Sequence, residues 1–148
     1  LHGNGFVARL SGATAEFLHM WLVMNVGNNP FSLDNKGELA FTFKPALQGW
    51  LFTEKKTKET LYIGRNKIDV SLMPNSFAFN LLGKTLVVYD NQSRKNTWGP
   101  DGAKPTAIRL FFSDGNEMEI AGDAIPPPHS YALRNGEILK IEVKLDSP

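Results

Sequence analysis

Four acidic residues lie close together in the sequence and are the first candidates for catalytic chemistry. They are Asp114, Glu117, Glu119 and Asp123. Glycoside hydrolysis requires two carboxyl groups that flank the scissile bond. These acids, however, lie in or beside Ser113–Asn116, a run typical of a hairpin turn, where acidic side chains usually face solvent. We therefore expect a solvated turn and not a catalytic pair.

The histidines and the known short motifs also give no self-contained active site. His2, His19 and His129 are the three histidines, and their spacing does not match the i, i+4 or alternate-strand spacings at which ligands meet on one metal ion. The sequence has no cysteine, which excludes disulfides and thiolate ligands. It contains neither a Gly-x-Ser-x-Gly elbow nor a Gly-rich phosphate loop ending in Gly-Lys-Ser/Thr. We expect no metal site, no cofactor and no catalytic residue within the chain.

Three aromatic residues could instead bind a sugar by stacking. Trp50 follows a predicted strand and a proline, Tyr89 lies in a predicted strand, and Trp98 lies in a long polar loop over residues 91–104. An aromatic ring on the surface of a β-sandwich can pack against the face of a sugar ring. Trp98 is the best candidate for exposure. The other interpretation is that these rings fill core or interface space, which is the more common role of tryptophan in sandwich folds.

The composition describes one domain of ordinary size. The chain has 148 residues, of which 42% are hydrophobic, enough for one core and too few for two usual domains. Its net charge of +1 provides no general field to attract nucleic acid or an anionic membrane. No apolar run is long enough to span a bilayer. We expect a cytoplasmic protein without a nucleic-acid or membrane partner and, since the chain begins at Leu1, a piece of a longer polypeptide.

The predicted N-terminal element is a helix over Ser11–Gly27. Ser11 is a good N-cap, Glu16 lies where the helix dipole favours an anion, and Gly27 can adopt the left-handed conformation that ends a helix. Apolar residues occupy nearly every face of this helix, so it needs partners on more than one side. A chain of strands covers only one of those sides, and we therefore expect a missing helical neighbour.

The rest of the sequence predicts short strands separated by turns. Leu39–Lys44 alternates apolar with polar or small residues, as a half-buried strand does. Runs of β-branched and aromatic residues predict further strands at residues 60–63, 67–72, 76–81, 84–90, 106–112, 117–121 and 137–145. Their number and spacing indicate a mainly β fold, a two-layer antiparallel β-sandwich of the jelly-roll type with one N-terminal α-helix. An immunoglobulin-like topology is the alternative.

Three finer expectations accompany this fold. The lead-in and helix would occupy residues 1–30 and the sandwich residues 31–148. The charged residues 53–59 predict an exposed loop, and Pro126–Pro128 predicts a stiff extended connection. In the last strand, Leu139, Ile141, Val143 and Leu145 alternate with polar residues, which places them on one face.

The parts from Ser11 to Trp50 follow one another in a distinctive order. Ser11–Thr14 opens the predicted helix, Gly27 ends it, and the strand Leu39–Lys44 runs into Pro45–Trp50. This order resembles the junction between the catalytic barrel and the C-terminal domain in inverting glycoside phosphorylases of the cellobiose phosphorylase type. In that family a loop similar to Thr-Gly-Ser-Ala-Gly-Trp opens the last long helix of an α/α barrel, the helix ends at a glycine, and a strand leads into a segment with Pro and Trp.

The resemblance implies that the chain is the end of a longer enzyme. Residues after the helix would form the family's jelly-roll C-terminal domain, and the general acid would lie upstream of Leu1, in an α/α-barrel catalytic domain of the same polypeptide. The parent reaction would be phosphorolysis of a β-glucoside-type disaccharide, with the sugar and inorganic phosphate as its ligands. By resemblance, the hydroxyl of Ser11 and the amide of Gly12 would help to hold the phosphate, a role that suits the N-terminus of a helix.

Two other classes of function fit the same sequence. One is a free-standing carbohydrate-binding or assembly β-sandwich, and the other is the same C-terminal domain on a glycoside hydrolase. Whether the protein forms a homodimer is also left open.

Overall fold

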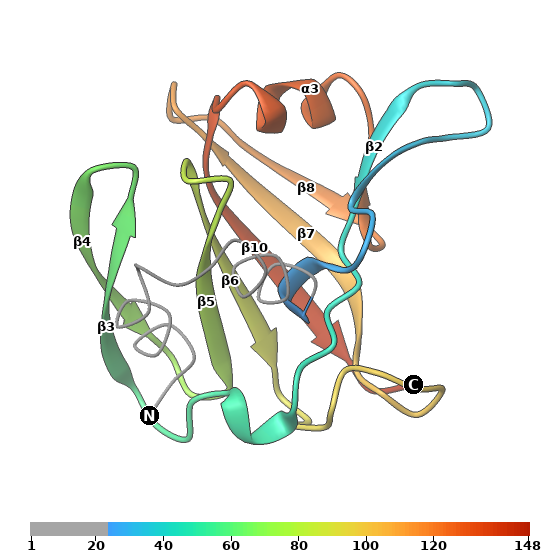
Figure 1. Cartoon of the computed structure of the whole chain (residues 1–148). Coiled ribbons are helices and arrows are strands. Elements are labelled where there is room, and N and C mark those ends of the chain that lie inside the picture. The colour runs from blue at the N-terminus through green and yellow to red at the C-terminus, as the bar shows by residue number, and fades with distance from the viewer. Residues whose placement is uncertain (1–23) are drawn as a thin grey trace.

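The computed structural model describes residues 24–148, and the largest unit in this part of the chain is a five-stranded sheet of order β5-β6-β10-β7-β8 (Figure 1). The strands are β5 (Ser76–Leu81), β6 (Thr85–Asn91), β7 (Lys104–Phe112), β8 (Glu117–Ala121) and β10 (Ile138–Asp146). The C-terminal strand β10 lies at the centre, where it joins the hairpin β5–β6 to the hairpin β7–β8.

Smaller sheets lie on the two faces of this central sheet. On one face, β1 (Phe31–Leu33), β2 (Leu39–Thr42) and β9 (Ala124–Ile125) form an antiparallel sheet of three strands. On the other face, the hairpin of β3 (Thr57–Ile63) and β4 (Asn66–Leu72) packs against β5 and β6. Two short helical elements, η1 (Gly49–Leu51) and α3 (His129–Arg134), lie at opposite ends of the sandwich (Figure 1).

Alternation along the strands separates a core face of the sheet from an outer face. Successive side chains of a strand point to opposite sides, and the apolar ones meet the β1-β2-β9 sheet and the segment that follows β2. The core includes Val26, Phe41, Phe43, Leu47, Phe52, Phe77, Phe79, Tyr89, Ile108, Leu110, Ile125, Ile141, Val143 and Leu145, all buried. A second cluster of Leu61, Leu72, Ala78 and Leu86 lies under the β3–β4 hairpin.

The predicted fold class is confirmed: the protein is a mainly β, sandwich-like fold with few helices. Strands β4, β5 and β8 closely match their predicted ranges. One pair, β6 and β10, is parallel, whereas the sequence predicts antiparallel pairing throughout. The loop over residues 92–103 returns the chain so that β7 runs opposite to β6, with room for one strand between them. A strand that fills this gap must be parallel to one of its neighbours.

Three local predictions are wrong, each for an identifiable reason. Leu139 is 55% exposed and Ile138 is buried instead, because the pairing of β10 with β7 shifts register between Ile138 and Lys140. β3 begins at Thr57, inside the charged run predicted as a loop. Only one face of a surface hairpin must be apolar, so charged residues can occupy the exposed face of a strand there. The connection after Pro126–Pro128 contains α3, which the burial of Leu133 and a hydrogen bond from Ser130 Oγ to the carbonyl of Leu39 (2.8 Å) hold against the sandwich.

Candidate functional site

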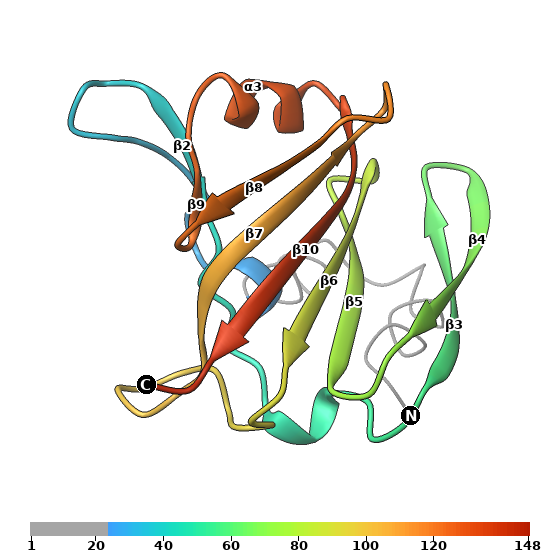
Figure 2. The ribbon, with the colours of Figure 1, turned by 180° about the vertical axis from the view of Figure 1, so that it is seen from behind.

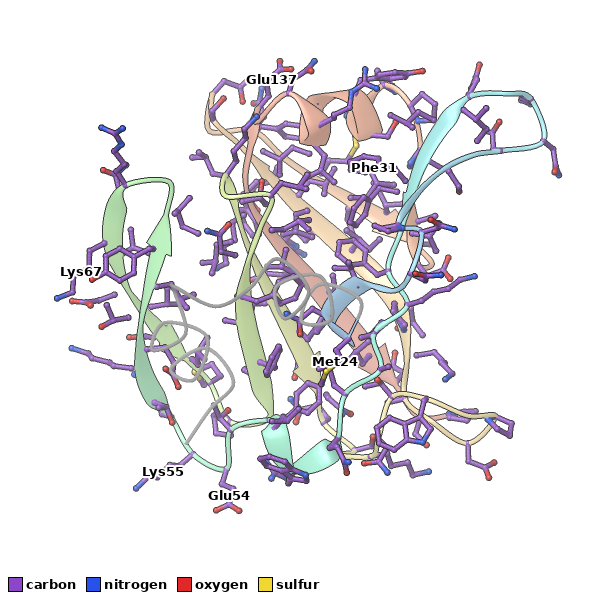
Figure 3. All side chains as sticks on the ribbon, viewed as in Figure 1. Met24, Phe31, Glu54, Lys55, Lys67 and Glu137 are labelled. Atoms are coloured by element: carbon purple, nitrogen blue, oxygen red, sulfur yellow. The ribbon has the colours of Figure 1, made fainter. Side chains whose placement is uncertain are left out.

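The two residues that the resemblance implies for phosphate, Ser11 and Gly12, lie outside the described residues, as does the predicted helix up to residue 23. The described part of that helix is its end, residues 24–26. In Figure 3, the labelled Met24 lies on this stretch, in front of the five-stranded sheet. What the structure describes is therefore the connection between the predicted helix and the sandwich.

The sandwich binds the last carbonyl groups of this helix. The amide of Ala46 donates to the carbonyl oxygen of Met24 at 2.7 Å, and the amide of Lys44 donates to that of Val26 at 2.9 Å. The last carbonyls of an α-helix have no partner within the helix itself. The segment after β2 therefore caps the helix from outside, and we call this contact, made by residues 24–27 with Lys44, Ala46 and Tyr89, the helix–sandwich junction.

Two apolar features fix the same contact. The side chain of Val26 is fully buried in the core beside the phenylalanines of β2 and the following segment. Gly27 has φ +107°, and a Cβ atom there would lie 3.1 Å from Cβ of Lys44. Glycine adopts this conformation without steric cost, so the predicted helix-ending role of Gly27 is confirmed.

Tyr89 belongs to the helix–sandwich junction and not to a sugar platform. The side chain is 0% exposed, and its ring packs against Phe43, with centroids 6.1 Å apart, and Phe79, at 5.4 Å. Its hydroxyl donates a hydrogen bond to the carbonyl oxygen of Asn25. The prediction that Tyr89 could stack on a sugar is therefore wrong, because its ring faces the core. The outer face of β6 is apolar as well, since the β3–β4 hairpin covers it.

Burial also changes the acidity of this phenol. Removal from water raises the pKa of Tyr89 well above its usual value of about 10, because the charged phenolate loses its hydration. The nearby side-chain amide of Asn25 is buried as well, and neither its nitrogen nor its oxygen has a hydrogen-bond partner among the described residues. The junction therefore places polar groups of Asn25 and Tyr89 inside the core.

Trp50 and Trp98 are exposed and lie on two segments that bind each other. Trp50, in η1, is 67% exposed and Trp98 is 44% exposed. Between their segments, Asn96 Oδ1 accepts from the amide of Gly49 at 2.8 Å, and Thr97 Oγ1 accepts from the amide of Leu47 at 2.8 Å. We call residues 45–52 and 91–103 together the tryptophan edge. The sequence correctly anticipates an exposed Trp98, and the structure brings Trp50 to the same edge.

Side-chain hydrogen bonds join the two segments of the tryptophan edge, and its surface has a shallow depression. Thr97 is buried, and its hydroxyl donates to the carbonyl of Pro45 at 2.7 Å. The same hydroxyl accepts from the amide of Leu47, so it is both donor and acceptor toward the neighbouring segment. A Cβ atom on Gly49 would lie 2.0 Å from the carbonyl oxygen of Arg94, so only glycine fits there. A shallow depression of about 420 Å³ is lined by Arg94, Lys95, Asn96, Trp98, Asp101 and Gly102. Such an edge could present an aromatic face to a ligand.

Of the four acidic candidates, Asp114 lies in the predicted turn, and Glu117 and Glu119 lie on the adjoining strand β8. Asp114 accepts hydrogen bonds from Asn116 within the turn that joins β7 to β8. The guanidinium of Arg109 forms ion pairs with Glu117 (3.6 Å) and Glu119 (3.3 Å).

The ring of His129 packs on Phe112 with centroids 5.5 Å apart. Within residues 24–148, no group of His, Asp and Glu side chains has the arrangement of a metal site, and no helix has the length and apolar character needed to cross a bilayer.

No protein-family model matches the chain, and no curated protein matches it. The fold and its contacts define the protein as a mainly β sandwich with the end of a helix bound to its core.

The buried hydroxyl of Tyr89 predicts a specific pH dependence of stability. The folded-state pKa is raised, so at alkaline pH the unfolded chain loses this proton first, and the contribution of Tyr89 is complete below pH about 10 and lost as pH rises above it. Tyr89→Phe should therefore weaken the fall in stability above pH 10. At neutral pH it should cost about 1–3 kcal/mol, since the carbonyl of Asn25 loses its donor.

Urea unfolding at several pH values measures both effects. Tyr62→Phe is the matched control, because Tyr62 is 53% exposed. Equal behaviour of the two variants would mean that the Tyr89 hydroxyl does not secure the helix–sandwich junction.

Proposed function

We propose that the chain is the C-terminal domain of a larger carbohydrate-active enzyme that resembles cellobiose phosphorylase, and that it is non-catalytic by itself. The observation that supports this most is the helix–sandwich junction. The amides of Lys44 and Ala46 and the hydroxyl of Tyr89 bind three consecutive carbonyls at the end of the predicted helix. Contacts of this kind would hold the end of the predicted helix against the sandwich, as the last helix of a catalytic barrel requires if the two domains move together.

In the parent enzyme, phosphate would attack the anomeric carbon of the sugar while the glycosidic bond breaks and its oxygen receives a proton from an acid in the barrel. Ser11 and Gly12 would contribute a hydroxyl and an amide to the phosphate site from the start of the predicted helix, where free N–H groups and the helix dipole favour an anion. The sandwich would support this site by holding the other end of the same helix. The pairing of Arg109 with Glu117 and Glu119 agrees with a domain that has no acid and base of its own.

Ser11→Ala in the full-length enzyme tests the phosphate role. Loss of one hydrogen bond to a charged group costs about 1.5–3 kcal/mol. We therefore expect kcat/KM for phosphate to fall about ten- to a hundredfold, with a smaller change in the KM for the sugar. Steady-state kinetics in the phosphorolytic direction, with thermal unfolding alongside, provides the measurement.

Ser113→Ala is the matched control, because Ser113 is an exposed serine in the turn after β7. If Ser11→Ala lowers only thermal stability, Ser11 is simply a helix cap. If the intact enzyme hydrolyses its substrate without phosphate, the domain belongs to a glycoside hydrolase instead.

The tryptophan edge favours a second candidate, a carbohydrate-binding module. Trp50 and Trp98 both expose their indole rings, and the hydrogen bonds of Asn96 and Thr97 fix the segments that carry them. Rigid rings of this kind can stack on sugars without a large loss of side-chain entropy.

Trp98→Ala tests this second candidate. If the edge binds sugar, the variant should bind an insoluble β-glucan about two- to tenfold more weakly than the unmodified chain, the loss expected for one ring contact. Tyr62→Ala, which removes an exposed ring from the β3–β4 hairpin, should bind as the unmodified chain does. Equal retention of all three proteins in a pull-down assay would exclude the tryptophan edge as a binding surface.

A further inference from the structure

The outer face of the five-stranded sheet carries a groove beside the β3–β4 hairpin. Its cavity of about 510 Å³ is walled by the end of β4 and by Met73, which follows it, and its floor is formed by β6, β10, β7 and β8. Figure 2 looks onto this face, where no other element among residues 24–148 covers these strands and the hairpin stands beside them. We call this feature the open-face groove. Its volume lies within the range of about 300–1,000 Å³ that is usual for ligand sites.

Four side chains on the floor, three of them charged, lie in register across the strands. Val88 on β6 is paired with Glu142 on β10, Glu142 with Arg109 on β7, and Arg109 with Glu119 on β8. Three strand spacings of about 4.8 Å make this row roughly 14 Å long. The row is therefore long enough for several linked rings and is open to solvent along one side.

The groove has balanced charge. Its charged lining residues are three acids and three bases, Asp90, Glu119, Glu142, Arg109, Lys140 and Lys144. A ligand with a net charge would meet as many like charges as opposite ones. Charge complementarity therefore favours a neutral ligand that both donates and accepts hydrogen bonds.

Each charged group is already oriented by a neighbour on the same face. Lys140 pairs with Glu142 at 3.1 Å, and Arg109 Nη2 with Glu119 Oε2 at 3.3 Å. These side chains are about half exposed, so water screens the pairs and they are weak. A guanidinium has five N–H donors and a carboxylate can accept several hydrogen bonds, so both keep free capacity toward the groove.

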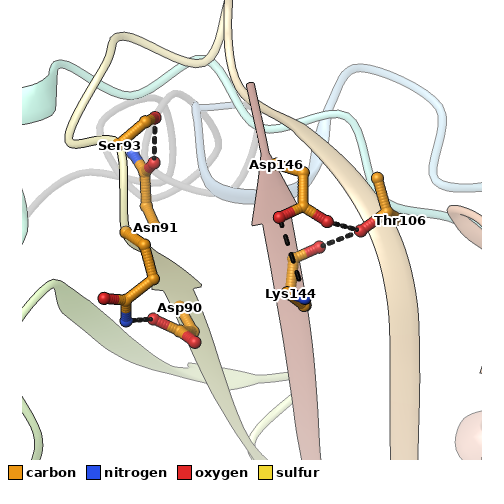
Figure 4. A network of polar contacts seen from close by, with 7 residues as sticks. Asp90, Asn91, Ser93, Thr106, Lys144 and Asp146 are labelled. Carbon is orange, nitrogen blue, oxygen red and sulfur yellow. Dashed lines mark hydrogen bonds and ion pairs between the residues drawn. The ribbon is translucent and has the colours of Figure 1, made fainter. Parts of the chain in front are cut away.

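The end of the groove near the C-terminal ends of β6 and β10 is ordered in the same way. The amide of Gln92 donates to Asp90 at 2.6 Å, and Lys144 pairs with Asp146 at 3.9 Å, next to the hydroxyl of Thr106 (Figure 4). Between these polar groups, Val88 and Ala107 contribute apolar surface to the floor. Met73, which is 65% exposed, contributes apolar surface to the wall.

We propose that the open-face groove binds a neutral oligosaccharide, laid across β6, β10, β7 and β8. Sugar hydroxyls donate to the carboxylates and accept from Arg109 and the lysines, and the apolar faces of the rings contact Val88, Ala107 and Met73. This inference goes beyond the proposed function and does not rest on it. The groove lies on the opposite face of the sheet from Val26 and the helix–sandwich junction.

The test is titration of the 148-residue chain with cellohexaose, xylohexaose and maltohexaose in separate experiments, followed by amide NMR. At least one of the three should bind saturably and shift amides of β6, β7, β8 and β10 around the groove. Arg109→Met should weaken this binding at least tenfold, the effect of losing one charged hydrogen bond. Arg65→Met, at the exposed tip of the β3–β4 hairpin, is the matched control and should bind normally.

Glu142→Gln is a second groove variant that keeps the side-chain shape, and the amide spectrum of each variant reports whether it is folded. The proposal is overturned if none of the sugars binds, or if binding survives both groove variants and is lost in Trp98→Ala. It is also overturned if only an extended peptide binds, along the edge of β4, which pairs only with β3 among the described strands. None of these outcomes alters the dependence of the parent enzyme on phosphate, which tests the proposed function separately.

Discussion

The carbonyl groups at the end of a helix must find partners, and here the partners are supplied by the sandwich. A buried carbonyl without a donor is costly, so the chain after β2 runs where its amides reach Met24 and Val26. The same requirement places a tyrosine in the core, since Tyr89 bonds the carbonyl of Asn25 from β6, 64 residues further along the chain. The position of the helix end and the packing of the core therefore depend on the same contacts.

Because the helix end packs on one face of the central sheet, the two faces of the sheet differ in composition. The inner face of β6, β7 and β10 packs against Val26 and the residues around β2, and it is apolar. The outer face does not pack against the helix end, and charged residues such as Arg109 and Glu142 form solvent-exposed ion pairs on it. The β3–β4 hairpin covers only the part over β5 and β6, and the groove begins where this cover ends. A supporting contact on one side thus leaves a surface for binding on the other.

The sequence predicts the features that depend on neighbouring residues. The strand at residues 117–121 and the left-handed Gly27 follow from local composition and turn chemistry. The features that depend on distant residues could not be predicted. In β6, the residues Leu86–Tyr89 are all apolar or aromatic, because the β3–β4 hairpin covers the outer face and the core covers the inner face. The sequence therefore has no alternation of polar and apolar residues from which the inward direction of Tyr89 could be predicted. Helix α3 has no side-chain cap and is held by the packing of Leu133.

Hydrogen exchange at the amides of Lys44 and Ala46 tests most directly whether the helix end and the sandwich form one unit. These amides donate to the helix carbonyls, so a fixed junction opens only when the whole domain unfolds. Their exchange should then report the same free energy of opening as the amide of Val143, a core residue of β10. Exchange of Lys44 and Ala46 at a much lower free energy, with Val143 still protected, would show that the helix end detaches on its own and would contradict a fixed junction.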